Sequence, residues 1–76
     1  MNERLPALTS KELMAALERA GFIKLRISGS HCRMAHAGDP SRKITIPIHA
    51  KDLKRGTLRA IIAQSGLTVA EFLALL

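Results

Sequence analysis

The stretch FIKLRISGSHCRMAH, residues 22–36, decides the fold. In both of its halves apolar residues alternate with polar ones, a period of two that is typical of a β-strand with one buried face. The apolar positions of this alternation are Ile23, Leu25, Ile27, Cys32 and Met34. Ser28-Gly29-Ser30 lies between the halves and is rich in turn formers, so residues 22–36 predict a β-hairpin.

A third strand is predicted over residues 43–48. It follows the segment Ala37-Gly38-Asp39-Pro40-Ser41, which is dense in turn-forming residues. Its isoleucines, at positions 44, 46 and 48, share one face. Pro47 has no backbone N–H to donate, so it favours a strand end or a sheet edge. Because the connections are short, the three strands are expected to form an antiparallel sheet with one apolar face.

Helices are predicted before and after these strands along the chain. The first covers residues 10–20, where Thr9 and Glu12 form a capping box and Gly21 supplies the end. A second covers residues 54–65 and ends at Gly66, and a short third helix follows a second capping box at Thr68-Val69-Ala70-Glu71. The predicted order is α-β-β-β-α with a short C-terminal helix. This is an α+β two-layer domain with a three-stranded antiparallel sheet, and residues 1–76 are expected to form one domain.

Composition narrows the class of protein further. Of the 76 residues 47% are hydrophobic, which is enough for a small core. Cys32 is the only cysteine, so neither an internal disulfide nor a multi-cysteine metal site is possible. The start Met1-Asn2-Glu3-Arg4 has no signal-peptide character, and no apolar run is long enough to span a membrane. The expected compartment is therefore the cytoplasm, with no membrane partner.

The positive charge is concentrated in the middle of the chain. The net charge is +6, yet residues 24–59 hold nine basic and two acidic side chains, a net of +7. The nine are Lys24, Arg26, Arg33, Arg42, Lys43, Lys51, Lys54, Arg55 and Arg59. A cationic middle with near-neutral ends favours a polyanion as partner, nucleic acid first, over a charge that serves solubility alone.

Strand orientation predicts which side chains face solvent. Burying Arg33 without a partner would cost several kcal/mol, whereas burying Cys32 and Met34 is favourable. Arg33 is therefore expected to face outward, and His31 with it. If the isoleucine faces of the first and third strands point toward the helices, the opposite faces carry Lys24, Arg26, Lys43 and Thr45. A single bulge near Gly29 would reverse this assignment.

A histidine among cations suits one reaction on RNA. Neighbouring positive charges favour a neutral imidazole, which can act as a base near pH 7. The RNA 2′-hydroxyl can attack the adjacent phosphate if a base removes its proton and cations stabilise the developing charge. An exposed histidine alone does not establish this chemistry, so His31 stays a candidate at this point.

Several collinear segments resemble toxins of the HicA (YcfA-like) family. They are residues 5–13 (LPALTSKEL), Ala20-Gly21-Phe22, Gly29-Ser30-His31, Ile46-Pro47-Ile48-His49, residues 53–59 (LKRGTLR) and residues 67–73 (LTVAEFL). The resemblance spans nearly the whole chain. It departs from the family at Cys32, where a second histidine is frequent, and at Arg55, where a proline is frequent.

The resemblance implies a double-stranded-RNA-binding-like fold and a function. It implies the toxin of a type II toxin–antitoxin system, a metal-independent endoribonuclease that cleaves mRNA through His31 without a cofactor. It also implies a cognate HicB-like antitoxin protein as partner. The RNA-binding candidates on the basic face and around the Gly-Ser-His motif are Lys24, Arg26, Gly29, Ser30, Arg33, Lys43 and His49.

Alternatives remain open for some of these residues. Gly29 serves either the turn or a close approach of RNA, and Ser30 either the turn or a phosphate. A metal site of His31, His36 and His49 matches no compact ligand spacing. The two competing functions are a non-catalytic RNA-binding module and a protein whose basic face docks an acidic partner. The scarcity of aromatic residues argues against readers that stack bases on exposed rings.

Overall fold

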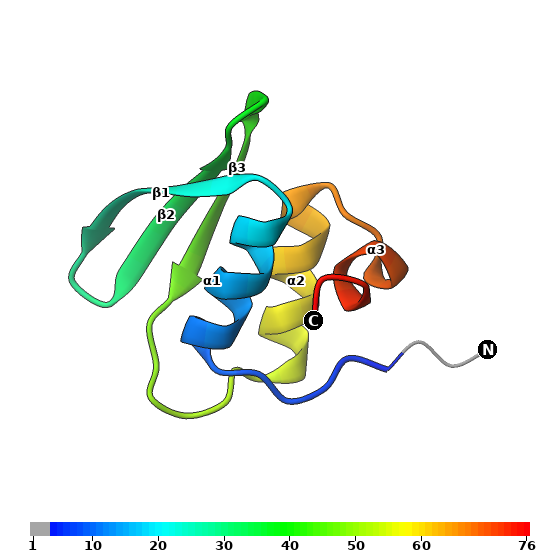
Figure 1. Cartoon of the computed structure of the whole chain (residues 1–76). Coiled ribbons are helices and arrows are strands. Elements are labelled where there is room, and N and C mark those ends of the chain that lie inside the picture. The colour runs from blue at the N-terminus through cyan, green and yellow to red at the C-terminus, as the bar shows by residue number, and fades with distance from the viewer. Residues whose placement is uncertain (1–3) are drawn as a thin grey trace.

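Two helices cover one face of a three-stranded sheet (Figure 1). The structure, a computed structural model, describes residues 4–76. The elements follow the order α1 (Ser10–Arg19), β1 (Phe22–Ser28), β2 (His31–His36), β3 (Asp39–Pro47), α2 (Arg55–Ser65) and α3 (Val69–Leu73). The strand order is β1-β2-β3 and both pairings are antiparallel, which confirms the predicted α+β class. Residues 1–3, on which the expectation of no signal peptide partly rests, lie outside the described residues.

The helix ends follow the local sequence signals. In α1 the Thr9 side chain accepts a hydrogen bond from the Glu12 N–H, and the Glu12 carboxylate accepts one from the Thr9 N–H. The same box forms before α3. Gly66 ends α2 with a φ of 81°, a left-handed conformation that favours glycine. The predicted boundaries hold to within one residue, because α1 ends at Arg19 and Lys54 is the N-cap of α2 rather than its first turn.

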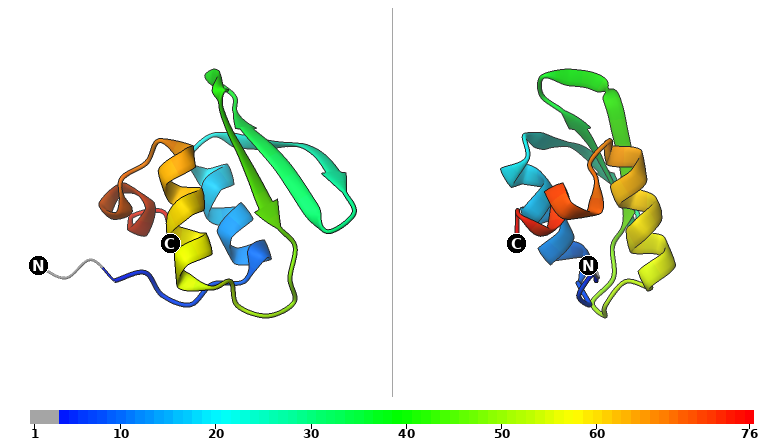
Figure 2. Two further views of the ribbon diagram at one scale, coloured as in Figure 1. Left: turned by 180° about the vertical axis from the view of Figure 1, so that it is seen from behind. Right: turned by 90° about the vertical axis from the view of Figure 1, so that its right-hand side faces the viewer.

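The core lies between the helices and the inner face of β2 and β3. Buried side chains from each element meet there: Leu13, Leu17, Phe22, Cys32, Met34, Ile44, Ile46, Leu58, Ile61, Ile62 and Phe72. Complete burial of one such aliphatic or aromatic side chain stabilises a fold by about 1.5–3 kcal/mol. Figure 2 shows that α3 lies on the far side of the helix layer from the sheet. The inward orientation predicted for Cys32, Met34, Ile44 and Ile46 is confirmed.

The predicted orientation of β1 is wrong over much of its length. Lys24 pairs with Met34 and Arg26 pairs with Arg33, so Leu25 between them is the extra residue of a β-bulge. Directly opposed residues share a face, which puts Lys24 on the inner side and Arg26 on the outer side. Ile23, Leu25 and Ile27 are 50%, 52% and 61% exposed, against the expectation that all three are buried. Phe22 is the only residue of β1 that reaches the core.

The second hairpin is tighter than predicted. A turn over residues 37–41 was expected, but only Ala37 and Gly38 form it, and β3 begins at Asp39 instead of Lys43. The pairing then shifts between Ala35 and His36, so that residues 40–42 bulge out of the ladder. This bulge carries Arg42 to the end of α2, where its Nε donates a hydrogen bond to the Ser65 carbonyl at 2.8 Å. Within residues 4–76, no helix has the length and apolar character needed to cross a membrane.

Candidate functional site

His31 stands at the first position of β2, directly after the turn of the first hairpin. It pairs with Ser28 on one side and with Pro47 on the other, and its side chain is exposed. Gly29 has a φ of 58°, in which a side chain would be strained, and no atom beyond Gly29 and its two chain neighbours lies within 4 Å of the position a Cβ would take. The Ile48 N–H donates a hydrogen bond to the Ser30 carbonyl at 2.6 Å, which joins the turn to the end of β3.

The outer sheet face is hollowed beside His31. The lining residues of this histidine hollow are Arg26, Ser28, His31, Arg33 and Thr45, and its volume is about 330 Å³. Arg26, Arg33 and Thr45 lie in one row across the three strands, because Arg33 pairs with both of the others. The hollow therefore brings together one imidazole, two guanidinium groups and two hydroxyl groups, with no carboxylate in its lining.

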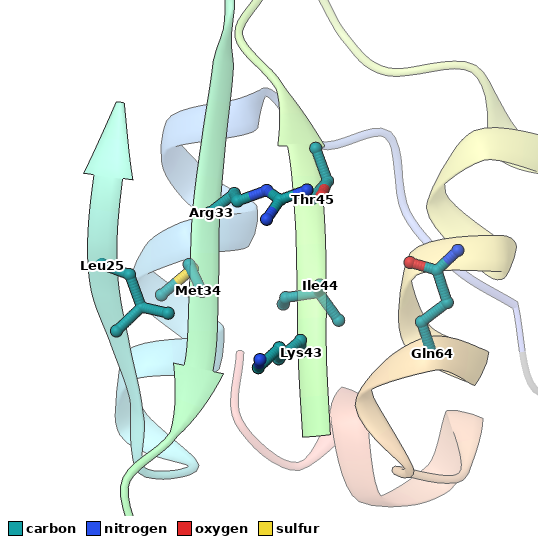
Figure 3. A pocket seen from close by; sticks show the side chains of 7 residues that line it. All are labelled: Leu25, Arg33, Met34, Lys43, Ile44, Thr45 and Gln64. Atoms are coloured by element: carbon teal, nitrogen blue, oxygen red, sulfur yellow. The ribbon is translucent and has the colours of Figure 1, made fainter. Parts of the chain in front are cut away.

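A second hollow adjoins the first one on the same face, and Figure 3 shows the side chains that line it. Its volume is about 180 Å³, and we call it the strand hollow. It is lined by Leu25, Arg33, Met34, Lys43, Ile44, Thr45 and Gln64. Figure 3 shows the Arg33 side chain extending over β3 toward Thr45, with Gln64 on α2 beyond that strand. Arg33 and Thr45 line both hollows, so the two form one continuous surface.

Apart from His49, the RNA-binding candidates divide among three places: the two hollows of the outer face, the turn beside His31, and the opposite face of the sheet. Arg26 and Arg33 line the histidine hollow, and Lys43 lines the strand hollow. Gly29 and Ser30 form the exposed turn next to His31. Lys24 was expected beside these residues but lies on the opposite face of the sheet. The reason is that the bulge of β1 occurs at Leu25, directly after Lys24, and not near Gly29. The prediction of an outward Lys24 is therefore corrected.

His49 lies apart from the histidine hollow. It lines a separate hollow of about 430 Å³ together with Pro47, Lys51, Asp52, Leu53, Lys54 and Thr57. Its backbone N–H donates to the Ser10 hydroxyl at 2.8 Å, and that hydroxyl donates to the Pro47 carbonyl at 2.6 Å. The buried Ser10 thus connects the start of α1 to the segment after β3, a role that sequence reasoning did not assign to it.

The remaining candidate side chains have structural positions. Both ring nitrogens of His36 contact the main chain: Nε2 lies 3.0 Å from the Ala20 carbonyl oxygen, and Nδ1 accepts from the Gly38 N–H at 3.0 Å. Cys32 is buried, and this burial raises the pKa of its thiol, which keeps it neutral. Among residues 4–76, no three His, Cys, Asp or Glu side chains are grouped so that they could hold a metal ion.

Sequence reasoning missed three residues of the outer face. Ser28 was assigned to the turn, although the pairing that closes the hairpin on His31 places it in the histidine hollow. Leu25 was assigned to the core, and only knowledge of the bulge could have moved it outward. Gln64 has no sequence signal, because its place beside β3 depends on how α2 packs against the sheet.

These features define a small basic α+β domain with an exposed histidine among arginines on its open sheet face. A family model described as HicA toxin of bacterial toxin-antitoxin matches residues 10–67, and the chain belongs to this family. It is accordingly the toxin of a toxin–antitoxin pair, and the family implies a cognate antitoxin. No curated protein matches the chain significantly.

Proposed function

We propose that this toxin is a metal-independent endoribonuclease that cleaves mRNA in the cytoplasm, with His31 as its catalytic residue. The observation that carries the proposal is the histidine hollow. An exposed imidazole stands there beside Arg26 and Arg33, with the hydroxyls of Ser28 and Thr45 on the same surface. Membership of the toxin family supports it, because a free nuclease would harm its own cell and needs an inhibitor.

The reaction follows from the groups in the hollow. The His31 imidazole takes the proton of a 2′-hydroxyl, whose oxygen attacks the adjacent phosphorus while the bond to the 5′-oxygen breaks. Arg26 and Arg33 stabilise the extra negative charge that the phosphoryl group carries in the transition state. The departing 5′-oxygen takes a proton from water, and His31 releases the proton it accepted to the solvent. The products are a 2′,3′-cyclic phosphate and a 5′-hydroxyl, and no metal ion takes part in these steps.

The RNA backbone crosses the outer face in this proposal. Arg26, Arg33 and Lys43 bind phosphates, and the turn at Gly29 and Ser30 allows the backbone to approach His31 closely because nothing stands over Gly29. His49 contacts RNA only where the RNA strand extends past Pro47 into the separate hollow that His49 lines. Arg33 contributes most among these residues, because it lines both hollows of the face.

The test is the chemistry of the product ends. A long RNA is incubated with the toxin in EDTA, and the ends are identified by their sensitivity to phosphatase and to cyclic-phosphate hydrolysis. Cleavage in EDTA with 2′,3′-cyclic phosphate ends is expected, and cleavage by the His31→Ala variant should be about 100- to 10,000-fold slower. Strict dependence on a divalent cation, or 3′-hydroxyl ends, would contradict the mechanism. Tight RNA binding without any cleavage would identify a non-catalytic RNA-binding module instead.

We propose further that the antitoxin inhibits by covering the outer sheet face. Arg26, Arg33 and Lys43 attract an acidic partner there and accelerate its association. The chain offers a matched control, since Lys24 is an exposed lysine like Lys43 but lies on the other face.

Association rates with the antitoxin distinguish the two faces. Lys43→Ala and Arg33→Ala are expected to slow association at low salt and to weaken its dependence on salt, whereas Lys24→Ala leaves both closer to wild type. An RNA oligonucleotide should fail to bind the preformed complex. Unchanged rates for all three variants, with normal RNA binding to the complex, would show that the antitoxin binds elsewhere.

A further inference from the structure

The strand hollow and the histidine hollow differ in chemistry although they share two residues. The histidine hollow is charged and polar, which suits a phosphate and a ribose. The strand hollow adds Leu25, which is 52% exposed although it is apolar, and the carboxamide of Gln64. A ligand that continues from one hollow into the other is therefore charged at one end and partly apolar at the other.

The shape of the strand hollow favours a flat group. Met34 and Ile44 line it, yet their side chains are buried on the inner face, so the main chain of β2 and β3 forms the floor. Leu25 stands on the β1 side of this floor and Gln64 on the α2 side (Figure 3). The volume of about 180 Å³ is below the roughly 300–1,000 Å³ of pockets for larger ligands. One planar ring system fits it, and a chain of several does not.

The polar groups around this floor suit the edge of such a ring. Gln64 offers a donor and an acceptor side by side, Thr45 can do either, and Lys43 donates only. The planar guanidinium of Arg33 can lie against a ring face. A nucleobase combines an apolar face with an edge of donors and acceptors, and in RNA it is attached to the phosphate that the adjoining hollow would hold.

We infer that the strand hollow binds one unpaired nucleobase next to the cleaved phosphate, with Leu25 against its face and Gln64 reading its edge. This inference rests on the proposed ribonuclease function and adds a specificity-determining subsite to it. A base seated there has left any duplex, so the toxin selects single-stranded positions of its RNA. Arg33 joins the two subsites, because it touches both the base and the phosphate side.

The experiment measures base preference at the cleaved step. Single-stranded oligonucleotides randomised on both sides of a fixed cleavage site are digested, and sequencing of the ends gives the relative kcat/KM for each base. Wild type is expected to prefer one base or one pair of bases at one of the two positions. Gln64→Ala should reduce this preference about three- to tenfold, the loss of one hydrogen bond to the base edge. Gln64→Glu, which exchanges a donor for an acceptor, should shift the preference toward bases with an amino group.

Leu25→Ala tests the contact with the base face. It is expected to raise KM for all four bases severalfold while kcat and the order of preference are kept. Leu76→Ala is the matched control, because Leu76 is also 52% exposed but lines a different groove, with Pro6, Ala7 and Arg19. An unchanged base distribution in both Gln64 variants, or equal KM values for the Leu25 and Leu76 variants, would overturn the subsite.

Binding separates this inference from the proposed function. Short fluorescent RNAs that differ in one base are titrated against the His31→Ala variant, with and without Gln64→Ala. A base-dependent affinity that disappears with Gln64→Ala supports the subsite even where wild type cleaves no RNA. Equal affinities for all bases refute it even where wild type cleaves. Absence of cleavage by wild type contradicts only the ribonuclease.

Discussion

The two hairpins of the sheet each carry a histidine next to a glycine turn, and the two turns are held in opposite ways. At the second hairpin, His36 is bonded through both ring nitrogens, to Ala20 and to Gly38, and its ring meets Phe22 edge-on at 5.1 Å. The Ala37 N–H adds a hydrogen bond to the Gly21 carbonyl at 2.9 Å. At the first hairpin, His31 projects into an open hollow among arginines.

The comparison shows how position alone separates a structural histidine from a candidate catalytic one. His36 fastens the second hairpin to the junction of α1 and β1, and its hydrogen-bonding capacity is used. The ring of His31 is free to meet a substrate, and the turn that carries it is joined to the sheet through the Ser30 main chain rather than through the imidazole. A pair of substitutions can therefore test each histidine against the other.

The largest expected effect is on RNA cleavage. His31→Ala should lower kcat by about 100- to 10,000-fold, the contribution of a positioned general base. His36→Ala should keep nearly the full rate per folded molecule, measured well below its unfolding temperature on the same long RNA. Equal loss of cleavage in the two variants would show that the exposed His31 contributes no more to catalysis than the structural His36.

For stability, the expected order of the two histidine variants is the reverse of that for cleavage. His36→Ala removes two hydrogen bonds and the edge contact with Phe22, so it should lower the free energy of unfolding by about 1–3 kcal/mol. His31→Ala, an exposed substitution, should stay within about 0.5 kcal/mol of wild type. Urea denaturation followed by circular dichroism measures both. A strongly destabilised His31→Ala variant would mean that the ring takes part in packing.

Much of this fold could be predicted because its signals are local. Capping boxes at Thr9 and Thr68 and the left-handed Gly66 depend on a few neighbouring residues, and they set the helix ends. The faces of β2 and β3 followed from alternation, since the helix layer covers both strands. The face of β1 could not be predicted in this way. The bulge at Leu25 shifts its phase, and the exposed Ile23 and Ile27 satisfy an apolar alternation without being buried.

The candidate site was predictable to the same extent. His31 and Arg33 share β2, so one argument about a single strand places both of them outside. Lys24 was placed wrongly because its face depends on the neighbouring strand's register. Gln64 could not be found at all, because it reaches the outer face only through the packing of α2 beside β3.

A smaller effect concerns RNA binding by two lysines. Lys43→Ala should lower RNA affinity and reduce the slope of log affinity against log salt by about one, the signature of one lost phosphate contact. Lys24→Ala should change the slope by less, because Lys24 faces the opposite side of the sheet from His31. Fluorescence anisotropy at four salt concentrations with the His31→Ala background gives both slopes. Equal slopes for the two variants would place RNA around the β1 edge rather than on the outer face.

The smallest expected effect is a difference between the two hairpins in how their local stability depends on pH. At the second hairpin the Asp39 carboxylate accepts hydrogen bonds from the Ser41 hydroxyl at 2.6 Å and from the Ser41 N–H, and these bonds lower the pKa of Asp39 below its usual 3.8. A carboxyl group whose pKa is lowered in the folded state stabilises that state at a pH above its ordinary pKa. It loses this contribution as the pH falls through its folded-state pKa.

Residues 24–33, around the first hairpin, contain no carboxylate. Acidification from pH 5 to pH 3 should therefore lower the protection factor, which is the intrinsic exchange rate at each pH divided by the observed one, at the Gly38 and Ser41 amides more than at those of Gly29 and Ser30. Asp39→Asn should flatten this dependence at the second hairpin and leave the first unchanged. A first hairpin that loosens as much as the second would show that acid acts on the whole sheet and not on the Asp39 turn.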